Sequence, residues 1–373
     1  MQNKPLIVGG SHHNTYGLVR CFGEAGMKVD CILYECRDSY VGHSKYIDKL
    51  LYCDSADAAG AKIKSLVKGS EKKRVVISAT DAVASLMDLH YDEFKENCFF
   101  FNAGKAGRLT YFMDKEVQTV AAAEAGLEIP KTKAFNKGEQ LQFGIFPCII
   151  KPLASIDGGK RIATCLNAYE LHLHAPEFAD VERVLIQQFI EKDEEIVLLG
   201  VALNGEISIP GYIIKYRDVM GGTTYSSTAP ISNIDAQLIK KAKKLIAAIR
   251  YEGLFGIELI KSGDKYYFVE VNLRNDATSY SLAVAGANLP LMYYKTCLGG
   301  LDLLEQGQDV RKIYSMVEIN DFRSVLHRKI GLFAWLRQRK DAECRYLYNR
   351  EDPEPYKLAK REFIDQMKKK LFG

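Results

Sequence analysis

The sequence predicts a doubly wound α/β domain at the N-terminus, followed by a strand-rich α+β region and a basic C-terminal appendix. The opening predicts this class, because the apolar strand Leu6–Gly9 runs through Gly-Gly-Ser into an amphipathic helix, Tyr16–Ala25, and then a second strand, Val29–Tyr34. Such a β-loop-α-β unit is typical of parallel strands joined by right-handed crossovers. From about Tyr111 hairpin signals replace this alternation, and from about Asp302 the chain becomes increasingly basic.

The remaining elements are expected in a regular order. In the first domain they are helix Ala56–Val67, strand Arg74–Ser78, helix Asp81–Leu89 and strand Cys98–Phe101. The strands expected next are Thr132–Phe135, Pro147–Pro152, Arg183–Phe189, Ile196–Leu203 and Glu206–Tyr216, the last two joined by an Asn-Gly hairpin turn. The helices expected among and after them are Asp114–Ala125, Asp235–Arg250, Thr278–Ala285 and Leu289–Gly299.

Composition and charge fit a water-soluble chain of two or three domains. Of its 373 residues 47% are hydrophobic and 26% are charged, with 51 lysines and arginines against 47 acids. These dispersed and nearly balanced charges disfavour a nucleic-acid binder. Nine cysteines without a C-x-x-C pair suit a reducing compartment. A short, quickly polar N-terminus and the lack of an apolar run of about 18 residues predict a cytoplasmic protein without a transmembrane segment.

The densest chemistry lies in a predicted β-hairpin near the end of the α+β region. Two apolar runs, Leu254–Ile260 and Tyr266–Val271, flank Ser-Gly-Asp. We expect a three-residue loop, Ser262–Asp264, because an odd loop puts Glu258 and Glu270 on one face of the hairpin. A two-residue loop would reverse the parity and separate the two acids.

Oxygen-bearing side chains would share that face. Glu258, Glu270 and Asn272 could hold one or two hard cations, and magnesium suits such a set because water and phosphate complete its octahedron. Arg274 falls on the same face if the strand continues, and would offer a fixed positive fork to phosphate or to a developing oxyanion. A solvated polar face is the alternative, but aromatic and aliphatic neighbours make this strand pair look like core, where an unpaired carboxylate is costly.

Cations and free backbone N–H groups for a phosphate-bearing ligand are also present. Lys115 begins a predicted helix, Lys151 ends a predicted strand, and the small-residue loop Ser155–Lys160 could wrap phosphate oxygens. This loop is not a Walker A motif, since no G-x-x-x-x-G-K-[ST] occurs. The opening glycines, GGSHHN, also lack the third glycine of G-x-G-x-x-G, which disfavours nicotinamide binding. His12 and His13 in that loop either contact substrate or form an exposed pair, and the exposed pair is the simpler interpretation.

In their order along the chain these motifs resemble those of the ATP-grasp superfamily, over roughly Leu6–Gly299. The resemblance implies an α/β N-terminal domain followed by an α+β ATP-grasp fold, whose two subdomains close on ATP. It divides the chain into segments 1–112, 113–190, 191–300 and a C-terminal helical appendix, 301–373. The residues that it assigns to ATP are Lys115, Lys151, the loop residues Ser155, Gly158 and Gly159, the hinge residues Gln188, Phe189 and Ile190, and Glu195 at the ribose.

The same resemblance implies Mg²⁺, or Mn²⁺, held by Glu258, Glu270 and Asn272, with Arg274 beside the transferred phosphoryl group. It implies an ATP-dependent, ADP-forming ligase that joins a small-molecule carboxylate to an amine through an acylphosphate. Two departures are Gln188, where the family often has glutamate, and a loop with fewer glycines. The N-terminal texture is most similar to D-aspartate-ligase-like and carbamoyl-phosphate-synthetase-like members, which suggests cell-envelope or polysaccharide modification. A kinase on the same scaffold and a non-catalytic nucleotide-binding protein are the alternatives.

Features elsewhere carry weaker signals. Lys215 is a second candidate for a γ-phosphate contact, or else a solvated hairpin lysine. Gly221–Thr224, within Lys215–Pro230, is expected to be a mobile loop that closes over the acceptor. The basic tail, with HRKIGLFAWLRQRK, predicts either peripheral contact with an anionic membrane or a solvated helix packed on its own domain. A homodimer is expected on general grounds alone.

Overall fold

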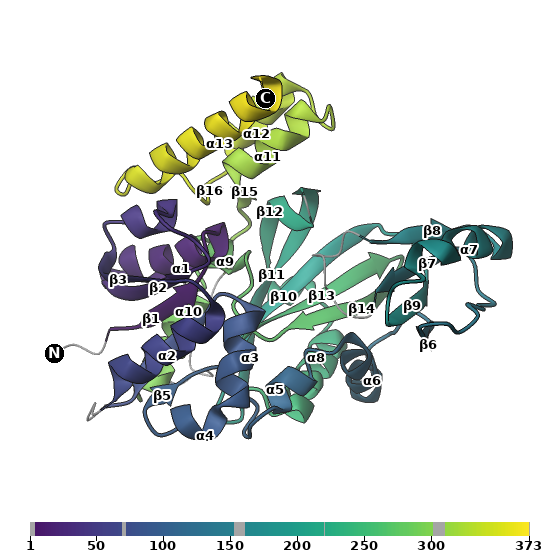
Figure 1. Cartoon of the computed structure of the whole chain (residues 1–373), viewed down its shortest axis with the longest axis horizontal. Coiled ribbons are helices and arrows are strands. Elements are labelled where there is room, and N and C mark those ends of the chain that lie inside the picture. Colours follow the sequence, from purple (N-terminus) through teal and green to yellow (C-terminus); the bar gives the residue numbers. More distant parts are fainter. Residues whose placement is uncertain (1–3, 69–71, 153–160, 220, 301–309, 373) are drawn as a thin grey trace.

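The computed structural model describes residues 4–68, 72–152, 161–219, 221–300 and 310–372, which form three sheets with flanking helices (Figure 1). The N-terminal sheet is parallel, with strand order β3-β2-β1-β4-β5. The order reverses between β1 and β4, and open α/β sheets bind ligands outside the carboxyl ends of strands at such a point. The strands are β1 Leu6–Gly9, β2 Val29–Tyr34, β3 Ile47–Cys53, β4 Arg74–Ser78 and β5 Cys98–Phe99, and the helices are α1 His13–Gly23, α2 Ala56–Val67, α3 Asp81–Leu89, α4 Tyr91–Phe94 and α5 Arg108–Tyr111.

Several details of this domain differ from expectation: helices α4 and α5 were not predicted, and β5 ends at Phe99 and not at Phe101. The edge strand β3 was not predicted, because its residues are half-buried or exposed and show neither an apolar run nor strict alternation. Helix α1 begins at His13 rather than at Tyr16, because the Nδ1 atom of His12 caps it by accepting a hydrogen bond from the Asn14 backbone N–H (3.1 Å). Histidine is not among the usual capping residues, so no sequence pattern indicated that the helix begins at His13.

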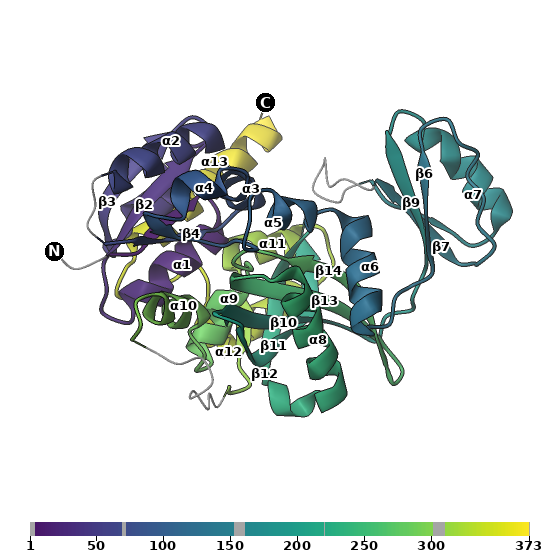
Figure 2. The same ribbon diagram turned by 90° about the horizontal axis from the view of Figure 1, so that it is seen from below.

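A small antiparallel sheet, in the order β6-β9-β7-β8, forms a lobe of its own (Figure 2). Helix α7 packs against β8, and the two sides of the lobe share a core that includes Phe135, Ile150, Leu171 and Ile186. The elements are β6 Thr132–Asn136, β7 Cys148–Pro152, β8 Ala163–Cys165, α7 Ala168–His174 and β9 Arg183–Gln188.

The largest sheet has seven strands in the order β14-β13-β10-β11-β12-β15-β16. Helix α6 packs against both α8 and β14, and α10 packs against β10 and β13. Its elements are α6 Lys115–Ala125, β10 Glu194–Leu203, β11 Glu206–Val219, β12 Gly222–Pro230, α8 Ala236–Ile249, β13 Gly253–Ser262, β14 Lys265–Asn272, α9 Ser279–Val284, α10 Leu289–Cys297, β15 Tyr314–Met316 and β16 Cys344–Arg345.

The prediction of a mobile loop at Gly221–Thr224 is wrong. Gly222 begins β12, which pairs with β11 on one side and with β15 on the other. The run from Tyr225 to Ala229 is buried, so a segment of small, hydroxyl-bearing residues serves as a central strand. Ser226 and Ser315 share a buried hydrogen bond of 2.6 Å, and the Thr228 hydroxyl donates to the Arg311 carbonyl. Partners supplied by β15 satisfy polar groups that would otherwise favour a loop.

The C-terminal appendix adds β15 and β16 to the large sheet and three helices above it (Figure 1). Arg217 on β11 forms an ion pair with buried Asp321 (2.6 Å), which also accepts from the indole nitrogen of Trp335 (2.9 Å). On the other side, Asp352 accepts from the Ser44 hydroxyl (2.5 Å) in the N-terminal domain. The appendix thus bridges two domains. Its helices are α11 Glu318–Leu326, α12 Leu332–Asp341 and α13 Glu354–Phe372.

Among the described residues, no helix combines the length and apolar character needed to cross a bilayer.

Candidate active site

The predicted hairpin exists as β13 and β14, but its turn differs from expectation. The three-residue loop is wrong: Ser262 pairs with Lys265, which leaves a two-residue turn at Gly263–Asp264. Gly263 has a φ of 57°, the left-handed conformation that glycine adopts readily. By itself, this turn would send Glu258 and Glu270 to opposite faces of the sheet.

A β-bulge restores the shared face. Leu259 pairs with Phe268, whereas Glu258 pairs with Glu270, so Val269 is an extra residue on β14. The extra residue reverses the parity a second time, and the two carboxylates become direct cross-strand neighbours. The predicted grouping of these acids is therefore present, although through a bulge and not through the loop.

An amide and a third acid complete this face. Asn272 pairs with Gly256, and its Nδ2 donates to the Glu258 Oε1 atom (3.2 Å) and to Asp276 Oδ2 (3.5 Å). A Cβ atom at Gly256 would lie 3.2 Å from Asp276 Oδ2, so glycine leaves the room that this acid occupies. Sequence reasoning missed Asp276, because it lies beyond the strand and strand alternation says nothing of its direction.

Lys215 on β11 lies between Glu195 and Glu258. Its Nζ donates to Glu195 (2.9 Å) and to Glu258 (2.7 Å), and the two charges raise the pKa of Lys215 despite its burial. Burial raises the pKa of Glu258 to about 7, with Glu270 and Asp276 adding to the effect and Lys215 opposing it. The face therefore holds more buried negative charge than its lysine neutralises.

This donor set fits Mg²⁺. Two carboxylates and an amide oxygen are a small set of hard ligands, which magnesium accepts when phosphate and water fill the other positions. Within the described ranges no three His, Cys, Asp or Glu side chains are arranged to hold a metal ion, and a cation would use Asn272 as the third donor. At present the Asn272 Oδ1 accepts from Arg274 (3.1 Å), so the amide would have to turn toward the ion.

Lys115 reaches the same acids from helix α6. Gln118, one turn further on, exchanges two hydrogen bonds with the backbone of Val271, at 2.9 and 3.0 Å, and thereby fixes α6 against β14. Asp114 caps the helix. The Lys115 Nζ consequently lies 3.2 Å from the Glu270 Oε2.

Lys151 approaches from the small lobe. Its Nζ donates to Gln187 Oε1 (3.0 Å). The pKa of Lys151 is lowered to about 8, mainly by burial and also by the charge of Lys115, while the charge of Glu270 opposes this. Two lysines from different lobes thus lie close enough to repel each other, and such a pair favours an anion between them. The loop residues Ser155, Gly158 and Gly159, predicted to contact phosphate, lie outside the described residues.

The predicted hinge follows β9. The backbone N–H of Gln188 donates to the Lys131 carbonyl (2.8 Å), and that of Phe189 donates to the Pro147 carbonyl (2.9 Å). These two amides are therefore engaged within the small lobe and do not point freely toward an adenine base. Glu195, the residue assigned to ribose, accepts from Lys192 (2.8 Å) as well as from Lys215.

Arg274 joins the hairpin to the N-terminal domain. Its Nε lies 3.0 Å from Asp81 Oδ1, at the start of α3 and beside the carboxyl end of β4. Nearby, the Asn14 side chain donates to the carbonyls of Ala79 and Asn275, both at 3.0 Å. These contacts hold the edge of the first sheet where the strand order reverses against the face that carries the acids. Asp81 and Asn14 were not assigned roles from sequence, because their partners lie about 190 and 260 residues away.

The two histidines behave differently. His12 is exposed at one edge, as expected, but His13 is buried within α1, so the interpretation as an exposed pair is wrong for His13. Desolvation lowers the pKa of His12 to about 4, with the charge of Arg274 adding to the effect, although solvent reaches one side of the ring. Burial lowers the pKa of His13 as well. Both rings are neutral at physiological pH.

Comparison with known proteins agrees with this geometry. Residues 113–278 match the family model described as "ATP-grasp domain". This stretch is therefore similar to an ATP-grasp domain. The antiparallel strands β6 to β14 lie within this stretch, and the α/β sheet before it and the C-terminal helices after it complete the predicted fold class, which is confirmed.

Solved structures share this fold across most of the chain. An N5-carboxyaminoimidazole synthetase from Staphylococcus aureus, complexed with ADP, superposes with a TM-score of 0.66 at 13% identity, covering 87% of this chain and 85% of its own. An L-amino acid ligase from Bacillus licheniformis superposes with a TM-score of 0.62 at 14% identity, covering 84% and 79%. At these identities the likeness shows the fold alone.

Curated relatives are similar over the central region. A formate-dependent phosphoribosylglycinamide formyltransferase of Bacillus velezensis is 31% identical over 230 residues, which are 57% of this chain and 57% of the relative. The enzyme of the same name from Flavobacterium psychrophilum is 28% identical over 229 residues, 57% of this chain and 59% of the relative. The match therefore spans less than two thirds of the length of either relative.

Proposed function

We propose that this protein is an ATP- and Mg²⁺-dependent ligase that activates a carboxylate as an acylphosphate, transfers the acyl group to an amine, and releases ADP and phosphate. One observation carries the proposal. Three acids and an amide on the large sheet meet two lysines from other elements at the strand-order reversal of the N-terminal sheet. An acid-rich and a lysine-rich surface that face each other suit a metal-bound polyphosphate.

Different residues of the site would bind the phosphate groups and the metal ion. Lys115 and Lys151 would bind phosphate oxygens and neutralise the charge that accumulates on them, and positioning of this kind supplies most of the rate in phosphoryl transfer. Glu258, Glu270 and Asn272 would hold Mg²⁺. When bound, the ion supplies charge neutralisation at the transferred phosphoryl group.

Lys215 and Arg274 have distinct roles in this proposal. With Glu258 engaged by the ion, Lys215 keeps Glu195 as its partner and can turn its ammonium group toward the γ-phosphate. Arg274, held by Asp81, presents its guanidinium group between the hairpin and the N-terminal domain. There it would donate hydrogen bonds to the oxyanion that forms when the amine attacks the acylphosphate.

Product analysis tests the proposal. Carboxylate and amine pairs are screened for ADP release, and each active acid is then offered hydroxylamine in place of the amine. A ligase forms a hydroxamate, whereas a kinase releases ADP without one and a nucleotide-binding regulator releases no ADP. Either of the latter outcomes would overturn the proposal.

We further propose that the appendix holds the enzyme at an anionic membrane surface, which would suit a role in cell-envelope modification. Helix α12 turns Trp335 inward, but Leu332, Phe333 and Leu336 project outward at 47, 87 and 46% exposure. The stretch from His327 to Lys340 contains five lysines and arginines and no acid. Outward apolar side chains among cations are typical of interfacial helices.

Vesicle sedimentation tests this surface. The protein should sediment with vesicles containing 30 mol% phosphatidylglycerol, roughly tenfold more than with phosphatidylcholine alone, and 0.5 M salt should weaken the interaction. Phe333→Ser should release it. Leu173→Ser, which changes an exposed leucine of α7 on the small lobe, is the matched control and should not. Equal binding to both vesicle types would contradict the proposal.

A further inference from the structure

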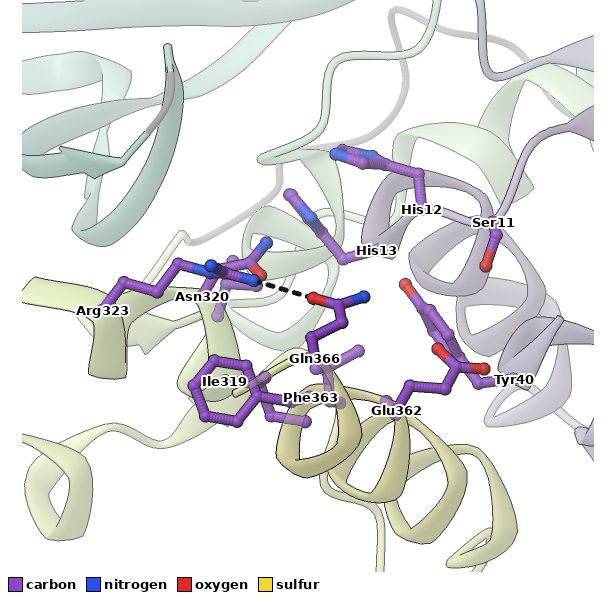
Figure 3. Close-up of a pocket in the computed structure, with 13 residues that line it drawn as sticks. Ser11, His12, His13, Tyr40, Ile319, Asn320, Arg323, Glu362, Phe363 and Gln366 are labelled. Atoms are coloured by element: carbon purple, nitrogen blue, oxygen red, sulfur yellow. Dashed lines mark hydrogen bonds between the residues drawn. The ribbon is translucent and has the colours of Figure 1, made fainter. Parts of the chain in front are cut away.

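A separate cavity of about 260 Å³ lies between the N-terminal domain and the appendix (Figure 3). The β1–α1 turn contributes His12, the start of α1 contributes His13, and helices α11 and α13 contribute Arg323 and Glu362. The volume is below that of pockets for drug-sized ligands and suits a small metabolite. No residue of the large-sheet acid face lines it.

The charges of this cavity are balanced and separated. Arg323 is the single lysine or arginine among its described lining residues, and Glu362 is the single acid. Figure 3 shows Arg323 on one side, where it donates to Gln366 Oε1 (3.2 Å), and the Glu362 carboxylate on the other, beside the Tyr40 hydroxyl. Since both histidines are neutral, the cavity presents one positive and one negative group across its width.

A buried polar atom in the wall also lacks a partner. His13 is 5% exposed, and its Nδ1 makes no hydrogen bond to any described residue. Leaving such a group unsatisfied costs about 1–3 kcal/mol. The wall of the cavity is therefore polar and partly open, since Glu362 and Gln366 are also exposed to solvent.

The cavity adjoins the candidate active site through His12. Asn14, two residues after His12, donates to the Asn275 carbonyl (3.0 Å), and the neighbouring Arg274 donates to Asn272 (3.1 Å). A ligand in the cavity would thus have the Glu362 and Arg323 groups on the appendix side and the phosphoryl-transfer residues beyond His12.

We propose that this cavity binds a free amino acid, with its α-carboxylate at Arg323 and its α-ammonium at Glu362, as one of the two substrates of the ligase proposed above. Both charged ends are then held by the appendix. The group that reacts, a carboxylate or an amine, lies on the amino-acid side chain and extends past His12 toward Arg274. A phosphorylated substrate fits less well, because it would meet one guanidinium and the repulsion of Glu362.

Binding of amino acids to the full-length protein, measured by calorimetry without nucleotide, tests the inference. The probes are the proteinogenic amino acids and their D-enantiomers, together with N-acetyl and α-amide derivatives of each binder, which lack the ammonium or the carboxylate. We expect a binder with an acidic or amino side chain, and at least tenfold weaker binding of both of its derivatives. Arg323→Gln and Glu362→Gln should each weaken the binder at least tenfold.

Matched controls lie on α13, the helix that carries Glu362. Arg361→Gln and Asp365→Asn remove exposed charges of α13 outside the cavity and should leave affinity unchanged. Variants that bind like the wild type, a derivative that binds as well as the free amino acid, or no binder at all would each overturn the inference. Because this measurement needs no turnover, it is distinct from the ADP-release screen: absence of ADP release with intact amino-acid binding refutes the ligase, not the cavity.

Discussion

The two sides of the candidate active site carry opposite electrostatic problems. On the large sheet, Glu258 is buried beside other acids, and its pKa is raised to about 7. On the small lobe, Lys151 is buried near Lys115, and its pKa is lowered to about 8. Each side thus holds buried charge without sufficient counter-charge. A metal–polyphosphate complex carries both positive and negative charge, so it stabilises the acids and the lysines at once. The metal ion alone would stabilise only the acids, and the polyphosphate alone only the lysines.

The largest expected effect comes from breaking the acidic side. Glu270→Gln should lower ATP turnover by about 10³-fold or more, because it removes a metal ligand and several kcal/mol of transition-state stabilisation. A steady-state ADP-release assay measures this. Glu194→Gln, on the opposite face of the neighbouring strand β10, should remain within about twofold of the wild type. Wild-type activity in Glu270→Gln would refute the metal assignment.

Arg274 tests the link between the acidic side and the N-terminal domain. Arg274→Gln should reduce kcat by about 10²–10³-fold with little change in the KM for ATP, since a donor to the developing oxyanion is lost. Asp81→Asn should cost less, because the guanidinium remains but is held less firmly. Arg311→Gln, at an exposed ion pair, serves as the control. A raised KM with unchanged kcat would assign Arg274 to binding instead.

The cationic side should act mainly through binding. Lys151→Gln should raise the Kd for ATP by about 10–100-fold, a loss of roughly 1.4–2.8 kcal/mol, because one of two phosphate-facing charges disappears. Lys133→Gln, at an exposed position on strand β6 of the same lobe, leaves the site untouched and is the comparison variant. Fluorescence titration with a labelled ATP analogue measures both. An unchanged Kd in Lys151→Gln would remove the lysine pair from the site.

The smallest effect is a dependence on pH. Lys151 has a lowered pKa of about 8, so it loses its proton as the pH rises through that value and its attraction for phosphate fades. The Kd for ATP should therefore increase several-fold between pH 7 and pH 9.5 in the wild type. Lys151→Arg, which stays charged, should show a flatter profile. Identical profiles would mean that another group controls the titration.

Much of the acidic side could be predicted from sequence. Glu270 and Asn272 are two apart on a strand, and a period of two fixes their common face through local geometry alone. Strands β1, β2 and β4 could also be predicted locally, because each is a run of apolar residues. The relation of Glu258 to Glu270 was predicted correctly through a wrong loop. Only the pairing register reveals the Val269 bulge, and register depends on packing along the whole hairpin.

The sequence by itself determined most of the strands and helices and which residue types could hold phosphate and a metal, because these follow from short-range periodicity and side-chain chemistry. The tertiary structure decided that Asp276, Asp81 and Asn14 belong to the site, that Gly222–Pro230 is a central strand, and that the appendix closes a cavity over His13. Those outcomes depend on contacts between residues far apart in the chain. No local pattern encodes which distant partner will satisfy a buried polar group.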